Sequence, residues 1–195
     1  MPALLTAARA LLRPTPPTSR AYRDALIGLG AGAVGTLLMG QYWVRVAPLV
    51  AGAPQEESGP PQPDTDVISP LGQTHENGES STAAMGRHLY TAITHQTPEQ
   101  GTRQALSEAV HWATGVLGGA AYGAVLARHQ GPATGILWGA GLWLLLDETI
   151  TPLLGLQDGP RAGNATTHGN RLGAHLAYGL GLGLSAAVLG RTLPK

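Results

Sequence analysis

Four apolar stretches that contain no charged residue set the organisation of this chain. They are Ala25–Val44, Ala109–Ala127, Gln130–Leu146 and Leu172–Gly190. Each is close to the ~20 residues that a helix needs to cross the hydrocarbon core of a bilayer. The pattern therefore predicts an all-α fold, an integral membrane bundle of four transmembrane helices.

Polar segments separate the four helices, and the longest of them is expected to form an external loop between the first and the second. Residues 82–95 of this loop can form a surface helix, because Met85, Leu89 and Ile93 lie on one helical face. The expected segments are an N-terminal segment 1–24, transmembrane helices 25–46, 104–127, 131–147 and 171–190, external loops 47–103 and 148–170, and a tail 191–195.

Basic residues divide unevenly between the two sides of this arrangement. One side carries Arg9, Arg13, Arg20, Arg23, Arg128, Arg191 and Lys195. The other carries the remaining arginines together with every acidic residue except Asp24. Because cytoplasmic loops are enriched in Lys and Arg, the sequence predicts a multi-pass protein of the inner membrane with both termini in the cytoplasm.

The composition indicates how the helices pack and argues against several classes of chemistry. The chain has 28 glycines, and small residues four apart let membrane helices approach closely. The glycines expected to pack helices are Gly28, Gly32, Gly35, Gly115, Gly119, Gly123, Gly135, Gly139, Gly173 and Gly181. With no cysteine and a formal net charge of +0, neither thiolate chemistry nor a nucleic-acid partner is expected. The expected partner is the lipid bilayer, and a second copy of the chain, in a homo-oligomer, is a further possibility.

One glycine pattern imitates a nucleotide-binding motif. Gly30, Gly32 and Gly35 match the GxGxxG fingerprint of dinucleotide-binding folds. That fingerprint requires a preceding strand and a βαβ continuation, whereas this chain continues into the Pro- and Gly-rich segment 51–73. No nucleotide cofactor is therefore expected.

The predicted topology brings polar side chains from all four helices to one outer layer. Glu108 and His111 lie on the face of the second helix that also carries Gly115, so they are expected to point into the bundle. The other members of the layer are Gln41, Arg45, Asp147, Glu148, His175 and Tyr178.

This layer admits two interpretations. Polar residues often hold membrane helices together, and a hydrogen-bonded network that sets helix register is favoured. The alternative is a divalent metal site of the zinc or iron type, for which Glu108, His111, Asp147 and His175 would suffice. No catalytic residue is identified, and the expected role is structural, regulatory or transport-related, with a shallow vestibule open to the outside.

Several motifs resemble those of the YagU-like family of uncharacterised bacterial inner-membrane proteins. They are the run 22–48, His111-Trp112 with Tyr122-Gly123, Trp138 with Asp147 and Pro152-Leu-Leu-Gly155-Leu156, and Gly173-Ala-His175-Leu-Ala-Tyr-Gly. The resemblance covers the four expected helices, about half of the chain, and implies an inner-membrane location and a membrane fold. His111 and His175 match two histidines of the family pattern. Asp147 stands in the place of a third, and Pro60-Pro61-Gln62 stands in the place of a Pro-Pro-Arg.

Overall fold

A computed structural model describes residues 19–51, 66–126 and 129–192, and these residues form helices and connecting turns without any strand. The expected all-α class is confirmed. The elements are α2 (Ser19–Arg45), α3 (Ala47–Ala51), α4 (Ser81–Thr94), α5 (Gln100–Val125), α6 (Pro132–Leu142), the π-helix η1 (Trp143–Ile150), α7 (Thr151–Leu153) and α8 (Ala165–Thr192). Parts of the expected N-terminal segment, external loop and tail, including Pro60-Pro61-Gln62, lie outside the described residues.

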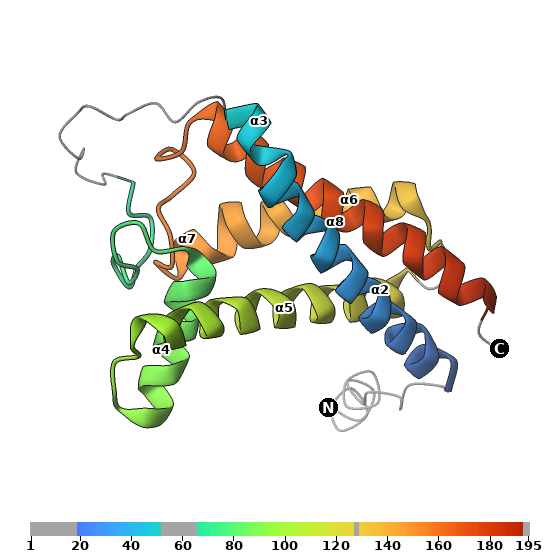
Figure 1. Cartoon of the computed structure of the whole chain (residues 1–195), viewed down its shortest axis with the longest axis horizontal. Helices are drawn as coiled ribbons and strands as arrows, with labels where there is room; N and C mark the ends of the chain where they lie inside the picture. The colour runs from blue at the N-terminus through green and yellow to red at the C-terminus, as the bar shows by residue number, and fades with distance from the viewer. Residues whose placement is uncertain (1–18, 52–65, 127–128, 193–195) are drawn as a thin grey trace, which may run out of the picture.

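The long helices α2 and α8 run antiparallel to one another through the centre of the molecule (Figure 1). Helix α5 packs on α2 and helix α6 packs on α8, whereas α5 and α6 contact each other little. The first turn of α2, the start of α6 and the last turns of α5 and α8 lie at the same end of the molecule, on the right of Figure 1. We call this the inner end and the opposite one the outer end.

Glycines allow α2 and α5 to meet backbone to backbone. A Cβ atom on Gly32 would lie 3.0 Å from Gly119 Cα, and a Cβ atom on Gly119 would lie 2.5 Å from Gly32 Cα. Gly28 faces Gly119 and Gly123 in the same way, and Gly115 faces Thr36. Since no side chain fits between these surfaces, the interface depends on the glycines.

The α6–α8 interface repeats this arrangement with a second set of glycines. A Cβ on Gly135 would lie 2.7 Å from Gly183 Cα, and one on Gly139 would lie 3.2 Å from Gly179 Cα. Gly179 and Gly183 take part in this contact, although neither was among the glycines expected to pack helices.

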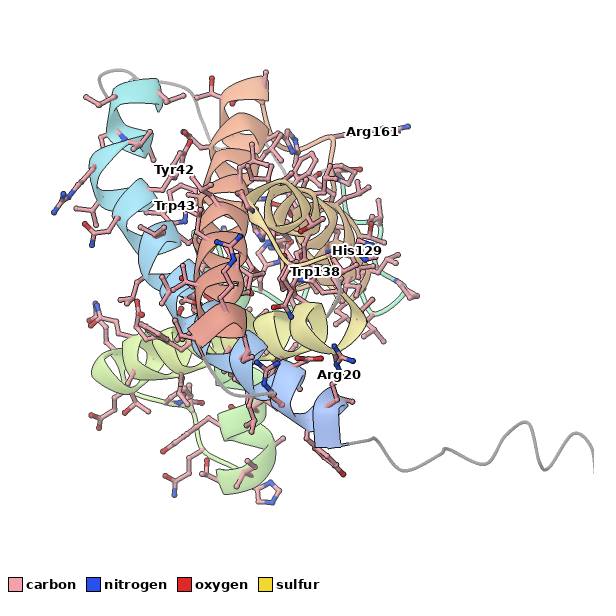
Figure 2. All side chains as sticks on the ribbon, turned by 90° about the vertical axis from the view of Figure 1, so that its right-hand side faces the viewer. Arg20, Tyr42, Trp43, His129, Trp138 and Arg161 are labelled. Atoms are coloured by element: carbon pink, nitrogen blue, oxygen red, sulfur yellow. The ribbon has the colours of Figure 1, made fainter. Side chains whose placement is uncertain are left out.

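A third set of contacts joins α2 to α8. Gly35, one of the glycines expected to pack helices, faces Tyr178 of α8, whereas Gly28 and Gly32 face α5. Gly181 packs on Leu38, and the ring of Tyr42 covers Gly173. In Figure 2 Tyr42 points from α2 towards α8, and its hydroxyl donates to Asn170 Oδ1 at 3.1 Å. The glycine face of α2 is therefore divided between two neighbours.

Helical residues extend into the expected loop 148–170 at both of its ends. The third helix continues through Asp147 as a π-helix and ends only after Leu153, because the wider π turn precedes Pro152 and accommodates a residue that lacks an N–H donor. Helix α8 begins at Ala165, because Asn164 Oδ1 accepts a hydrogen bond from the Thr167 N–H at 2.9 Å and so caps the first turn.

The surface helix expected over residues 82–95 is α4, Ser81–Thr94, which packs against the outer half of α5. Ser80 caps it by accepting a hydrogen bond from Ala83 N at 3.2 Å. The segment before α4 is bound to the loop before α8, where Thr74 N and His75 N donate to Gly155 O at 2.9 and 3.1 Å. Gly155 has a φ of +72° and lies against Gly72, so this contact requires glycine. Together these segments cover the outer end.

Two of the described helices are long and apolar enough to cross a membrane, namely the stretches Arg20–Arg45 and Ala165–Thr192. Four such helices were expected from the sequence. Helix α5 begins with a polar third that includes Arg103 and Glu108, and α6 is only 11 residues long before the helix widens at Trp143. Neither meets the same criterion of length and apolar composition.

Candidate functional site

A cavity of about 490 Å³ lies at the outer end, between α2, the start of α4, α5, η1 and α8. Its inner floor is closed by groups that already have partners. The Tyr178 hydroxyl donates to Gly115 O at 2.6 Å, and the Thr36 hydroxyl donates to Gly32 O at 2.9 Å. The ionisable residues that line it are Glu79, His111, Asp147, Arg171 and His175.

Close packing of α6 on α8 brings Asp147 and His175 together. His175 Nδ1 lies 3.0 Å from Arg171 O and 3.8 Å from Asp147 Oδ2. Because a carbonyl oxygen can only accept, Nδ1 carries a proton and donates to Arg171 O. In the neutral ring Nε2 is then a free acceptor.

Two opposite charges in the cavity lack hydrogen-bond partners. Within the described part of the chain, no acceptor receives a hydrogen bond from the Arg171 guanidinium, and no donor reaches the Asp147 carboxylate. The Arg171 charge acts on Asp147, but the two groups do not form an ion pair. Half-buried charges of this kind usually have partners. The cavity therefore offers one cationic and one anionic contact to a ligand.

The rim of the cavity is held by an ion pair outside the expected membrane-spanning segments. Arg87 donates from Nε and Nη2 to the two oxygens of Glu79, at 2.9 and 2.7 Å. This hydrogen bonding lowers the pKa of the Glu79 carboxyl below its ordinary value and raises that of Arg87. Since Arg87 neutralises it, Glu79 adds little net charge to the cavity.

Four of the eight residues expected in the outer polar layer line this cavity, and four do not. His111, Asp147, His175 and Tyr178 come together as expected. Glu108 is exposed, and Glu148 accepts a hydrogen bond from His168 Nδ1 at 2.7 Å instead.

Gln41 and Arg45 do not line the cavity because of their positions around the axis of α2. The cavity-facing residues of α2 are Thr36, Met39 and Trp43, which are separated by three and four positions. Gln41 lies about 140° around the helix from Thr36, and Arg45 lies on the side opposite to it. Both side chains are exposed.

The geometry does not support the metal interpretation. Among the residues that the structure describes, no group of three or more His, Cys, Asp or Glu side chains is placed to hold an ion. Glu108 points to the surface, so the expected set of Glu108, His111, Asp147 and His175 does not converge.

The sequence did not single out Arg171, which adds a positive charge to the cavity lining. Arg171 was counted only among the basic residues of the outer side, yet it lies one turn before His175 on the same face of α8. Its spacing from His175 was the available signal. The contribution of Ser81, Thr82 and Met85 at the start of α4 carried no such signal, because it depends on how the outer segments fold back.

The chain matches no family model, and no curated protein or solved structure is found to be similar to it.

Proposed function

We propose that this chain is a multi-pass inner-membrane protein that binds a polar headgroup or small polar ligand in an externally open vestibule. The observation that carries the proposal is where large and small side chains lie on the helices. Large apolar side chains on the helices point outwards and are more than half exposed, while glycines occupy the contacts between helices. Examples of such exposed side chains are Leu26, Leu37, Leu117, Leu137, Leu144 and Val188.

A bilayer accounts for this distribution. Soluble proteins rarely expose a continuous apolar surface of this kind, because burial of apolar area is the main force that folds them in water. In lipid there is no such penalty, and helices associate through close backbone contact. On this proposal α5 and the continuous α6–η1–α7 segment also span the bilayer, antiparallel to their partners α2 and α8.

The orientation follows from charge. With Arg20 and Arg191 near the inner end, the positive-inside rule assigns that end to the cytoplasm and the cavity to the outside. The resemblance to the YagU-like family supports the same location.

A binding role, whether regulatory, structural or transport-related, agrees best with the cavity. Its polar groups lie at the outer end. Below the cavity, Tyr178 belongs to the buried cluster that also contains Ile27, Ala31, Tyr122, Leu182 and Ala186. No chain of ionisable side chains leads through that cluster among the described residues. The site therefore resembles a vestibule rather than a pore.

Single-cysteine labelling tests this proposal directly, because the natural chain has no cysteine. Gly101→Cys and Ser81→Cys lie at the outer end, the second of them in the cavity wall, and Thr192→Cys lies at the inner end. In intact cells, a thiol reagent that cannot cross membranes should label the first two and should label Thr192→Cys only after permeabilisation. Release of the protein by an alkaline wash without detergent, or the reverse labelling pattern, would refute the proposal.

A further inference from the structure

An apolar groove of about 460 Å³ runs along α6 beside the end of α5. Its walls are Leu126, Leu137, Trp138, Leu142 and Leu145, with Thr134 and Gly141. The Thr134 hydroxyl already donates to a backbone carbonyl, His129 O at 2.6 Å. The groove thus presents no free polar group to a ligand. From Thr134 to Leu145 it follows about 16 Å of helix.

This groove adjoins the polar cavity at Leu142. Leu142 lines both spaces, with Leu145 on the groove side and Leu146 on the cavity side. Helices α5 and α6 are held together towards the inner end, where Trp138 Nε1 donates to Gly118 O at 3.1 Å and the Tyr122 hydroxyl lies 2.9 Å from Thr134 Oγ1. Beyond Leu142 the two helices make few contacts, so a molecule can lie across both spaces from the lipid side.

The cavity end of this path carries the two charges without hydrogen-bond partners, Arg171 and Asp147. A guanidinium binds phosphate oxygens through parallel N–H bonds, and a carboxylate binds an ammonium group. A phosphate alone would give the Asp147 carboxylate no hydrogen-bond donor, and an amine alone would give the Arg171 guanidinium no acceptor. A headgroup that carries both satisfies the two residues at once.

We infer that this site holds a zwitterionic phospholipid of the bilayer with a primary ammonium group, of the phosphatidylethanolamine class. Its phosphate binds Arg171, its ammonium group binds Asp147, and one acyl chain lies in the α6 groove. A choline headgroup fits less well, because a quaternary ammonium has no N–H to donate to Asp147. A soluble phosphoamine would leave the apolar groove unfilled. The inference rests on the proposed membrane location and specifies the ligand of the proposed vestibule.

Lipid retention by the purified full chain tests the inference. The protein in detergent is incubated with equal amounts of phosphatidylethanolamine, phosphatidylcholine and phosphatidylglycerol, and the retained lipid is identified by native mass spectrometry. One phosphatidylethanolamine should be retained over either competitor by about tenfold, which corresponds to about 1.4 kcal/mol. Asp147→Asn should abolish this preference, and Arg171→Gln should lower the retention of all three lipids, because each carries a phosphate. Leu142→Trp, which fills the junction, should abolish retention. Arg45→Gln changes an exposed arginine at the same end and should behave as the wild type.

Retention without regard to headgroup, or equal retention by Arg171→Gln and Arg45→Gln, would overturn the inference and would indicate ordinary boundary lipid. The wild-type comparison of the three lipids decides the matter even if a charge variant fails to fold. Binding of soluble phosphoethanolamine without selective lipid retention would also overturn it, while leaving the vestibule intact. Failure of the membrane proposal itself appears separately, in the cysteine-labelling pattern.

Discussion

Glu79 and Arg87 hold the rim of the cavity through a bidentate pair that is largely shielded from water. The Glu79 side chain is 7% exposed and that of Arg87 is 14% exposed. Arg87 also donates to Thr74 O at 2.8 Å, so one guanidinium joins the middle of α4 to the segment before the helix. Surface ion pairs contribute little, but this geometry is among the stronger ones. The pair therefore fixes the outer segments over the cavity.

The lowered pKa of Glu79 determines how this contribution depends on pH. Because the folded-state pKa lies below the ordinary value of 4.5, the pair stabilises the fold above that pH, and its contribution is lost as the pH falls through the lowered value. We expect Glu79→Gln to lower the melting temperature by about 2–4 °C at neutral pH. The difference from the wild type should shrink below pH 4.5, as measured by thermal unfolding in detergent.

Glu99→Gln is the matched control, because Glu99 is exposed and makes no side-chain cap bond. It should melt close to the wild type at every pH. A Glu79→Gln difference that does not change with pH would contradict the assigned role of the pair.

Residue identity and helical period were sufficient to bring His111, Asp147 and His175 to one cavity. They were not sufficient for Glu108. Three positions along a helix correspond to a rotation of about 300°, so Glu108 lies about 60° from His111 around the helix axis. At that angle a small rotation of α5 decides whether the side chain faces the cavity or the surface. They were also not sufficient for the α4 wall, because the path of the outer segments depends on contacts such as Thr74 with Gly155 that join distant parts of the chain.

At the scale of elements, the helices owe their arrangement to glycines at intervals of four. The interval places each glycine on the same helical face, and two such faces meet without side chains between them. Charge-free windows predicted where the helices lie. They did not predict where the third helix ends or where the fourth begins. The Asn164 cap and the π-helix before Pro152 depend on local hydrogen bonding that hydropathy does not register.

A pair of matched glycines in different positions tests the packing. Gly119 meets the α2 backbone, whereas a Cβ on Gly40 of α2 would meet nothing within 4 Å. Gly119→Ala should destabilise the protein by about 1–3 kcal/mol through overpacking. Gly40→Ala should be neutral or stabilising by up to about 1 kcal/mol, because alanine favours helix. Chemical unfolding in mixed micelles measures both, and equal effects would show that the α2–α5 contact is not close.

At the scale of the whole molecule, the chain consists of two glycine-packed helix pairs that follow one another in sequence. The first pair is α2 with α5, and the second is α6 with α8. They are joined chiefly by the contact of α2 with α8, through Gly35 with Tyr178 and Gly181 with Leu38. The cavity lies where the two pairs diverge at the outer end, so each pair supplies part of its wall. Arg161, by contrast, projects away from the helices (Figure 2).

This organisation predicts that the two pairs can assemble as separate chains. Residues 1–128 and 129–195, produced together with a tag on only one of them, should co-purify from detergent extracts, because the cut falls outside the α2–α8 interface. Gly181→Leu should reduce co-purification by about tenfold, since its side chain would overlap Leu38, 2.7 Å from the new Cβ. Gly40→Leu adds the same side chain on an open face of α2 and should leave co-purification unchanged. Wild-type halves that do not associate, or an equal loss in both variants, would mean that the connection between α5 and α6, and not the central α2–α8 contact, holds the molecule together.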